Sequence, residues 1–321
     1  MTNSDIFGNH LSLSLKIKFY NVETILNVNS ISKVFGSITA VDQLSFKVQR
    51  GEVIGMLGPN GSGKTTTLSV ILSVINATSG NYSWFNGLKG DAANKRIGSL
   101  LEVPNFYPYL NLEKNLMITA LARGAGENDI PRILDEVGLL KRSRSAYYTL
   151  SLGMKQRLAI ASTLIGDPEV LVLDEPTNGL DPEGIAEVRD LIRNQVLRGK
   201  TIIMASHILD EVEKVCSNVV ILKKGKCIAS GRVAELLSEK QVVIIETNDT
   251  ELLIIQLRQN SNCRLISREN GTLLVEIDDT YSPSELNTWL FSNGITLNRL
   301  EVKRRTLESQ FLELISKPEN L

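Results

Sequence analysis

The feature that most constrains this chain is a glycine-rich loop at residues 58–65, which reads GPNGSGKT. It fits the pattern G-x-x-x-x-G-K-[ST], in which backbone N–H groups surround a phosphate. The apolar stretch at 52–57 predicts a buried parallel strand before the loop, and residues 65–75 predict a helix after it. A chance glycine-rich turn is the competing interpretation, and this flanking context argues against it. The loop therefore predicts nucleotide binding.

The loop residues have distinct expected roles. Its glycines permit the backbone angles of a phosphate cradle, and the helix that follows adds its positive N-terminal end. We expect Lys64 to reach the β- and γ-phosphates of ATP and the Thr65 hydroxyl to ligate Mg²⁺. The predicted nucleotide-binding residues of the loop are Gly58, Pro59, Asn60, Gly61, Ser62, Gly63, Lys64, Thr65 and Thr66.

Length and composition bound the class of protein. The chain has 321 residues and 42% hydrophobic content, which favours one large domain plus a smaller one. Its formal net charge is −1, so the chain has no overall positive potential to attract nucleic acid, which is therefore not an expected partner. No stretch approaches the roughly 18–20 apolar residues of a membrane span. We therefore expect a soluble chain, which leaves docking on a membrane protein open.

The cysteines are Cys216, Cys227 and Cys263. They have an odd count and no metal-ligand spacing, which favours free thiols in a reducing compartment over a disulfide framework. We expect them to be packing residues.

The order of elements predicts an α/β fold. Residues 1–23 are expected to be an N-terminal extension that is either poorly ordered or upstream of the true start. Residues 24–232 begin with two antiparallel strands, contain short strands and turns between 83 and 101 and a helical subdomain at about 102–165, and otherwise alternate strand and helix as in a parallel sheet. Residues 241–316 read βαββαβ followed by a helix at 307–315, a small α+β accessory domain with a split-βαβ arrangement. We expect that domain to be regulatory or to stabilise a dimer.

Two local patterns refine this organisation. Ser282 and Glu285 form a predicted capping box at a helix start. The sequence VVILKKGKCIASG predicts a β-hairpin with its turn at residues 223–226. The lysines of that turn are either a phosphate site or a solvated hairpin tip, and we favour the tip.

Acidic residues and a histidine follow two predicted buried strands. Residues 170–176 read VLVLDEP and place Asp174 and Glu175 at the carboxyl end of one strand, where parallel sheets bind ligands. We expect Asp174 to hold Mg²⁺ and Glu175 to act as general base toward the attacking water. His207 follows the strand TIIMAS and is expected to bind the γ-phosphate and orient that water. An acidic turn and an ordinary core histidine are the alternatives.

Taken together, these motifs resemble those of the nucleotide-binding subunit of an ABC transporter. The resemblance covers residues 24–232 and rests on five motifs in the family's order. They read GPNGSGKTT (58–66), SLGMKQR (151–157), LVLDEP (171–176), NGLDP (178–182) and SH (206–207). The resemblance implies a P-loop NTPase (ABC ATPase) core with an antiparallel β subdomain and a helical subdomain, and ATP and Mg²⁺ as cofactors.

The resemblance also implies that two copies join head to tail around two nucleotides. In the family's signature segment, Ser151 and Gly153 would bind the γ-phosphate held by the partner copy, and Asp181 would face that partner. Leu152 and Met154 depart from the family's LSGGQ pattern and leave the strength of activation across the dimer open. A plain helix N-terminus is the alternative for the signature segment, and a simple turn before the helix at Glu183 is the alternative for Asp181. Phe35 stands where the family stacks an aromatic ring on adenine, with core packing as the alternative.

Glu102 stands where the family has a γ-phosphate-sensing glutamine. An ionised carboxylate can contact Mg²⁺ or its water but cannot donate a hydrogen bond, so its sensing chemistry must differ. This variant, with SLGMKQR, resembles bacterial exporters of the bacitracin-resistance and lantibiotic-immunity type.

The resemblance implies an ATPase subunit on the cytoplasmic face of the plasma membrane, working with separately encoded membrane subunits. A groove near residues 102–112 would receive the membrane subunit's coupling helix. One alternative is a non-transport ABC ATPase that clamps nucleic acid or the ribosome, against which the neutral charge argues. A catalytically silent subunit is the other, against which Lys64, Glu175 and His207 argue.

Overall fold

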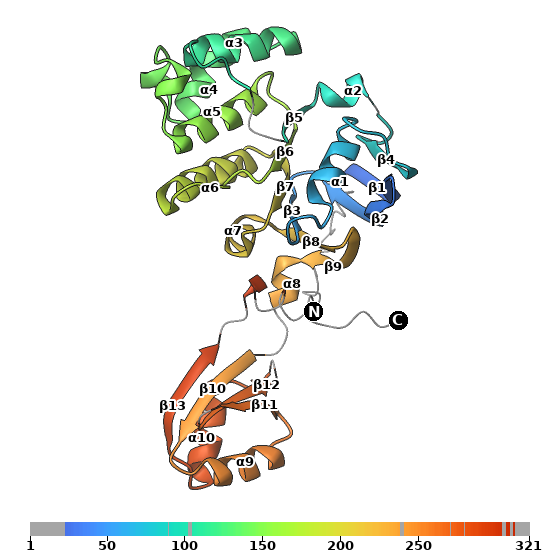
Figure 1. Cartoon of the computed structure of the whole chain (residues 1–321). Helices are drawn as coiled ribbons and strands as arrows, with labels where there is room; N and C mark the ends of the chain where they lie inside the picture. The colour runs from blue at the N-terminus through green and yellow to red at the C-terminus, as the bar shows by residue number, and fades with distance from the viewer. Residues whose placement is uncertain are drawn as a thin grey trace, which may run out of the picture.

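The computed structural model describes residues 23–88, 90–101, 105–237, 241–269, 271–278, 280–303, 306–308 and 311. Three sheets organise these residues (Figure 1). The predicted N-terminal extension lies outside the described residues apart from Glu23, and so does most of the predicted helix at 307–315.

A six-stranded sheet forms the centre of the larger part of the chain. Its order is β5 (Ile97–Leu100), β6 (Val170–Asp174), β7 (Thr201–Ser206), β3 (Val53–Leu57), β8 (Asn218–Lys223) and β9 (Lys226–Arg232). All neighbours are parallel except β8 and β9, which form the predicted hairpin. Every residue of β3, β6 and β7 is buried, as expected for parallel strands covered on both faces. The carboxyl ends of these three strands therefore meet at one edge.

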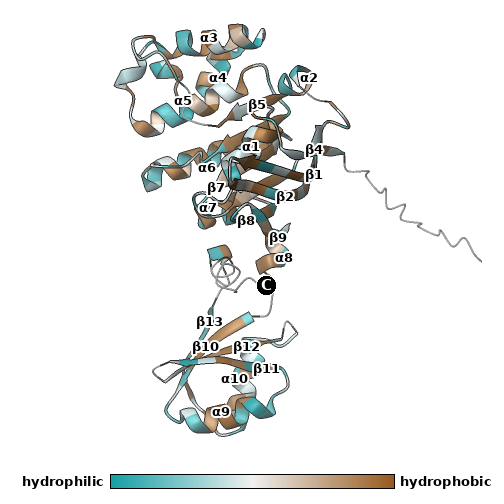
Figure 2. Ribbon diagram, turned by 45° about the vertical axis from the view of Figure 1, so that its right-hand side comes forward, coloured by the Kyte–Doolittle hydropathy of each residue, from teal (hydrophilic) through white to brown (hydrophobic). Residues whose placement is uncertain are grey.

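An antiparallel sheet packs beside the central one in the order β2 (Ile38–Gln49), β1 (Thr24–Phe35) and β4 (Ser79–Trp84). The buried Trp84 indole donates a hydrogen bond of 2.7 Å to the carbonyl oxygen of Ile71, at the end of α1 (Lys64–Ile71). Figure 2 shows brown, hydrophobic residues in β1 and β2, which lie near α1. The apolar core between this sheet and α1 thus supports the helix that follows the glycine-rich loop.

Helices cover the central sheet and form a subdomain of their own. The subdomain contains α3 (Leu112–Arg123), α4 (Ile130–Glu136) and α5 (Leu152–Leu164), while α6 (Pro182–Leu197), α7 (Leu209–Val215) and α8 (Val233–Leu237) follow later in the chain. Pro131 lies in the first turn of α4, as predicted. The prediction of only strands and turns between 83 and 101 was wrong in one respect, because residues Asp91–Asn94 form a short helix, α2.

Helix α5 approaches the central sheet closely at Gly98 of β5. A Cβ atom at this position would lie 2.0 Å from the carbonyl oxygen of Thr163 in α5. Only glycine permits that distance without movement of the backbone, so the packing of the helix on the strand depends on Gly98.

The third sheet is the small C-terminal one. Its order is β11 (Cys263–Glu269), β12 (Thr272–Ile277), β10 (Gln241–Thr247) and β13 (Leu297–Lys303), with α9 (Thr250–Gln259) and α10 (Pro283–Ser292) in the connections. Because β12 lies between β10 and β11, the arrangement is the predicted split βαβ. The predicted capping box of Ser282 and Glu285 is also present. The unit has its own apolar core.

The cysteines occupy three different environments. Cys216 is buried, and burial raises the pKa of its thiol well above the ordinary range. Cys263 is half-buried, and burial raises its pKa to about 11. The expectation that all three are packing residues was wrong for Cys227, which is exposed on the edge strand β9.

Candidate nucleotide-binding and catalytic site

The glycine-rich loop joins β3 to α1 in a conformation that requires glycine. Gly58 and Gly63 have φ angles of 155° and 103°. A Cβ atom at Gly58 would lie 2.4 Å from the Leu222 carbonyl oxygen, and one at Gly63 would lie 2.4 Å from that of Ala40. The loop is therefore held tightly between β8 and β2, and its N–H groups precede a helix of eight residues.

Lys64 folds back over this loop. Its ammonium donates a hydrogen bond of 2.7 Å to the Gly58 carbonyl oxygen and lies 3.4 Å from both the Pro59 carbonyl oxygen and Oε1 of Glu175. The residue is only 5% exposed. These contacts place a buried positive charge where a phosphate at the loop would lie.

Glu175 connects Lys64 to the end of β7. Its Oε2 lies 2.7 Å from Nδ1 of His207 and accepts a hydrogen bond of 3.3 Å from the His207 backbone N–H. The backbone of Glu175 has a φ of 47°, a left-handed conformation that is uncommon outside glycine. The N–H of Glu175 donates to the Ala205 carbonyl oxygen at 3.0 Å, which fixes this turn against β7. The predicted base and histidine therefore contact each other.

A first cavity of about 530 Å³ lies over the loop. Phe35 lies on its wall with 48% of its surface exposed, so it is not a core residue. The ammonium of Lys33 lies 4.8 Å from the centre of its ring. Most of the predicted loop residues line this cavity, namely Asn60, Gly61, Ser62, Gly63, Lys64, Thr65 and Thr66. Gly58 and Pro59 lie behind it and contact Lys64 through their carbonyl oxygens.

The β8–β9 turn also reaches the first cavity. Lys224 lines it, and the N–H of Gly225 donates a hydrogen bond of 3.0 Å to the Ser62 carbonyl oxygen. Lys224 and Lys226 are both exposed, as the interpretation of this turn as a solvated tip predicts, and Lys224 also lines the cavity.

A second cavity of about 480 Å³ shares the lining residues Thr65 and Glu175 with the first. Asp174, which is 8% exposed at the end of β6, lines it together with Glu175. A threonine hydroxyl and a carboxylate at a phosphate site are oxygen ligands of the kind that Mg²⁺ uses together with substrate phosphates. The remaining lining residues are Leu100, Leu101, Gln156 and Asn178.

Gln156 was not predicted as a site residue. The periodicity of α5 could have indicated it. Gln156 is a polar residue on the buried face of the helix, which it shares with Ala159, Ile160 and Thr163. Sequence motifs alone gave no reason to separate it from the remainder of SLGMKQR.

Ser151, Gly153 and Asp181 lie at the starts of helices and are not among the described residues that line either cavity. The Ser151 hydroxyl caps α5 by accepting a hydrogen bond of 3.3 Å from the Met154 N–H. Asp181 caps α6 by accepting one of 2.9 Å from the Gly184 N–H. A Cβ atom at Gly153 would meet nothing within 4 Å. These predicted residues therefore lie apart from the cavities of their own subunit.

Glu102, predicted as a nucleotide and Mg²⁺ contact, lies outside the described residues, as do Val103 and Pro104. Shortly after these residues lie two exposed tyrosines, Tyr107 and Tyr109, whose ring centres are 6.1 Å apart.

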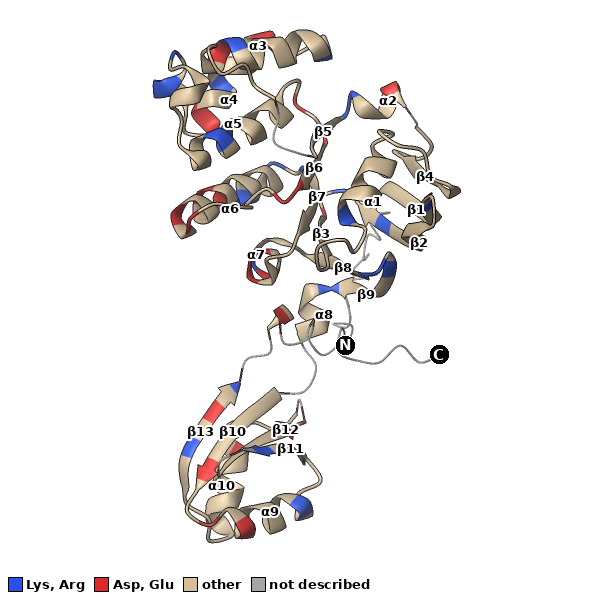
Figure 3. Cartoon of the chain, viewed as in Figure 1, with Lys and Arg blue, Asp and Glu red and all other residues tan. Residues whose placement is uncertain are grey.

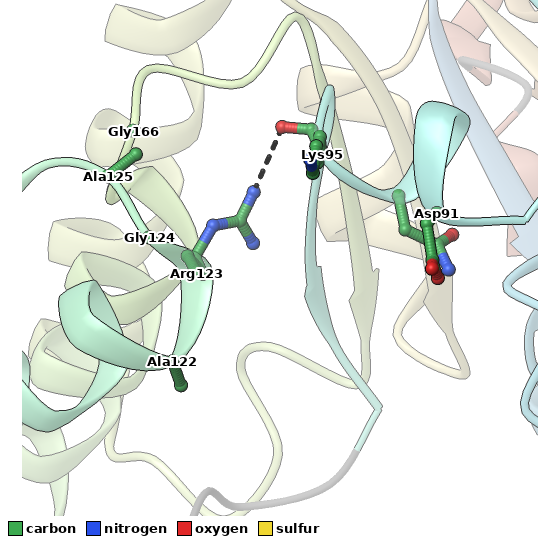
Figure 4. A pocket seen from close by; sticks show the side chains of 8 residues that line it. Asp91, Lys95, Ala122, Arg123, Gly124, Ala125 and Gly166 are labelled. Atoms are coloured by element: carbon green, nitrogen blue, oxygen red, sulfur yellow. Dashed lines mark hydrogen bonds between the residues drawn. The ribbon is translucent and has the colours of Figure 1, made fainter.

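A third cavity, of about 520 Å³, lies between α2 and the end of α3 (Figure 4). Arg123 is directed toward the start of β5, where it donates hydrogen bonds of 3.0 Å to the Ile97 carbonyl oxygen and 3.4 Å to that of Lys95. Desolvation lowers the pKa of this guanidinium. The contact ties the helical subdomain to the central sheet.

The surface charge is mixed. Figure 3 shows blue and red segments interspersed over α3 to α7. Among the described residues, no helix is both long and apolar enough to cross a membrane.

The chain is similar to known proteins in sequence and in fold. A family model described as ABC transporter matches residues 41–178. The chain is 35% identical to the bacitracin transport ATP-binding protein BcrA of Bacillus licheniformis over 300 residues, 92% of this chain and 98% of that protein. It is 37% identical to the lantibiotic transport ATP-binding protein SrtF of Streptococcus pyogenes over 205 residues, 64% of this chain and 89% of that protein. A solved structure described as the ATP-binding subunit of an ABC transporter has a TM-score of 0.60 at 31% identity, covering 66% of this chain and 92% of that one.

Proposed function

The chain belongs to the ATP-binding proteins of ABC transporters, and on that premise we propose that it hydrolyses ATP to power a bacterial exporter whose membrane subunits are separate chains. The names of its relatives support an exporter of the bacitracin and lantibiotic type. The observation that carries the proposal is the connected set of Lys64, Glu175 and His207, which joins the phosphate loop to the ends of β6 and β7.

In this proposal the chain's own groups perform hydrolysis by positioning and charge stabilisation. The Lys64 ammonium exchanges its carbonyl partners for phosphate oxygens, while Phe35 stacks on the adenine. Glu175 takes the proton of the attacking water. His207 donates the N–H of Nδ1 to the Glu175 carboxylate and would bind the γ-phosphate through an N–H on its other ring nitrogen, an arrangement that needs the imidazolium form. Thr65 and Asp174 would hold Mg²⁺, which neutralises developing phosphate charge when bound. Glu102 is proposed as a further Mg²⁺ and nucleotide contact.

We further propose that the working unit is a head-to-tail dimer of this chain. Ser151, Gly153 and Asp181 lie at helix starts outside the two cavities of their own subunit. The positive end of α5 at Ser151 and the open space beside Gly153 suit a phosphate brought by a second copy. Each copy would thereby complete the partner's ATP site.

The proposed permease docks on the helical subdomain at the cytoplasmic face of the plasma membrane. Large apolar and aromatic side chains are exposed there, and such patches mark protein contacts. They are Tyr107, Tyr109, Met117, Ile118 and Leu121. The third cavity lies between α2 and the end of α3, and Arg123 on its wall hydrogen-bonds the start of β5, so motion of a docked helix would be passed to the central sheet.

Affinity purification of the Glu175→Gln protein from detergent-solubilised cells, with ATP and Mg²⁺ present, tests the proposal. Co-purification of a polytopic membrane protein, identified by mass spectrometry, is expected. The Lys64→Ala protein is the matched control, because it lacks the phosphate contact and should not retain the closed complex. Recovery of only nucleic acid or ribosomal components would refute the exporter function.

A further inference from the structure

Gln156 is a polar side chain on the buried face of α5. It is 9% exposed, whereas the other members of its helical stripe, Ala159, Ile160 and Thr163, are almost fully buried core residues. In the part of the chain that the structure describes, the Gln156 carboxamide makes no hydrogen bond. The residue is mostly buried, but its carboxamide lines a cavity, so a ligand bound there can reach the amide group.

The Gln156 side chain faces the second cavity, which it shares with Thr65, Asp174 and Glu175. Those three supply oxygen atoms, and the γ-phosphate of ATP would bring further anionic oxygens to the same space. Among the described lining residues, the side chains with N–H donors are Gln156 and Asn178. Asn178 is exposed, so Gln156 is the donor whose position is fixed by burial.

Backbone packing sets where Gln156 lies. The close contact between Gly98 of β5 and the Thr163 carbonyl oxygen holds α5 against the central sheet. The neighbouring Arg157 donates a hydrogen bond of 3.2 Å to the Val137 carbonyl oxygen and so ties α5 to the end of α4. These contacts hold the backbone of α5 in place, so Gln156 lines the cavity without any movement of the helix.

We propose that Gln156 binds the γ-phosphate of the ATP held by its own subunit, through an N–H of its carboxamide. This inference rests on the proposed ATPase function and deepens it. The carboxylate of Glu102 cannot donate such a hydrogen bond while ionised, and Gln156 supplies the missing donor from a different element. Since Ser151 begins the same helix, α5 would contact the partner's ATP at its first turn and its own ATP at Gln156.

Nucleotide affinities of the full chain with Mg²⁺ test this inference, using ADP and a non-hydrolysable ATP analogue as probes. Gln156→Glu keeps the side-chain size and removes the donor, and Gln156→Met removes it without adding charge. Both variants should bind the analogue about tenfold more weakly or worse, because a hydrogen bond to a charged group is lost. Both should bind ADP within about twofold of the unmodified protein, because ADP lacks the γ-phosphate. Lys155→Ala, one residue earlier on α5, should change neither affinity.

Two results would overturn the inference. Unchanged affinity of both variants for the analogue would show that Gln156 does not contact the γ-phosphate. Equal losses for ADP and the analogue would assign Gln156 a structural role, which thermal unfolding without nucleotide would reveal independently. If the unmodified protein bound neither probe, the proposed ATPase function itself would fail, and that outcome is distinct from the other two.

Discussion

Replacing Glu175 with glutamine removes one charge from the centre of the site while keeping its shape. In the structure, Glu175 Oε1 lies 3.4 Å from the Lys64 ammonium and Oε2 lies 2.7 Å from His207 Nδ1. An amide oxygen can still face the lysine and an amide N–H can still face the imidazole, so we expect the fold and the loop to be preserved. What the variant cannot do is accept a proton from water.

The expected loss follows from that missing proton acceptor. A positioned general base contributes roughly 10²–10⁴-fold to a rate, which corresponds to about 3–5 kcal/mol of transition-state free energy. Binding of ATP should be kept or strengthened, because the variant removes a negative charge that would lie beside the γ-phosphate. We therefore expect kcat to fall by at least about 10²-fold without a rise in the Kd for ATP.

Steady-state phosphate release and equilibrium ATP binding measure these two quantities separately. Glu251→Gln is the matched control, since it makes the same chemical change in a carboxylate that pairs with Arg268 in the C-terminal unit. The control should keep kcat within about twofold of the unmodified protein. A Glu175→Gln protein with kcat within about threefold of the unmodified protein would remove Glu175 as the general base.

Three further outcomes are expected. Lys64→Ala should weaken ATP binding by roughly 10–100-fold in calorimetry, because charge-assisted hydrogen bonds to the phosphates are lost, and unchanged affinity would refute the role of the lysine. Gly98→Ala should destabilise the chain by roughly 1–3 kcal/mol in urea unfolding, because its Cβ would lie 2.0 Å from the backbone oxygen of α5, whereas Gly231→Ala, which has nothing within 4 Å, should not. Hydrogen bonds to arginines lower the pKa of Glu169 from 4.5 to about 2, so its ion pairs contribute stability that is present above pH 4.5 and lost as pH falls to 2. Glu169→Gln should flatten the stability profile in that window, and an unchanged profile would contradict the coupling.

The sequence allowed prediction of those site residues that lie at the carboxyl ends of buried parallel strands. Asp174, Glu175 and His207 follow continuous apolar runs, and such runs predict buried parallel strands whose carboxyl ends meet. The contact between Glu175 and His207 follows from that rule and from the adjacency of β6 and β7. The split βαβ of the C-terminal unit was predictable for a similar reason, because period and turn residues marked each element.

The unpredicted parts depend on packing between elements distant in sequence. The cavity at Gln156 exists because α5 lies on β5, and that approach is set by Gly98, whose role no local pattern reveals. The placement of Lys224 on the wall of the first cavity likewise depends on the β8–β9 turn contacting the loop. The exposure of Cys227 follows from β9 being an edge strand, which the sequence of one hairpin does not indicate.

The position of β3 within the central sheet has a consequence for synthesis of the chain. Its neighbours are β7 and β8, which follow it by roughly 150 residues, so at about 5–20 residues per second β3 waits some 8–30 s for its partners. During that interval the phosphate loop has no sheet to hold it, and a fully apolar strand edge is open to other chains. The nascent protein therefore acquires nucleotide affinity only late in translation. ATP in the cell can stabilise only those chains in which the central sheet has already formed.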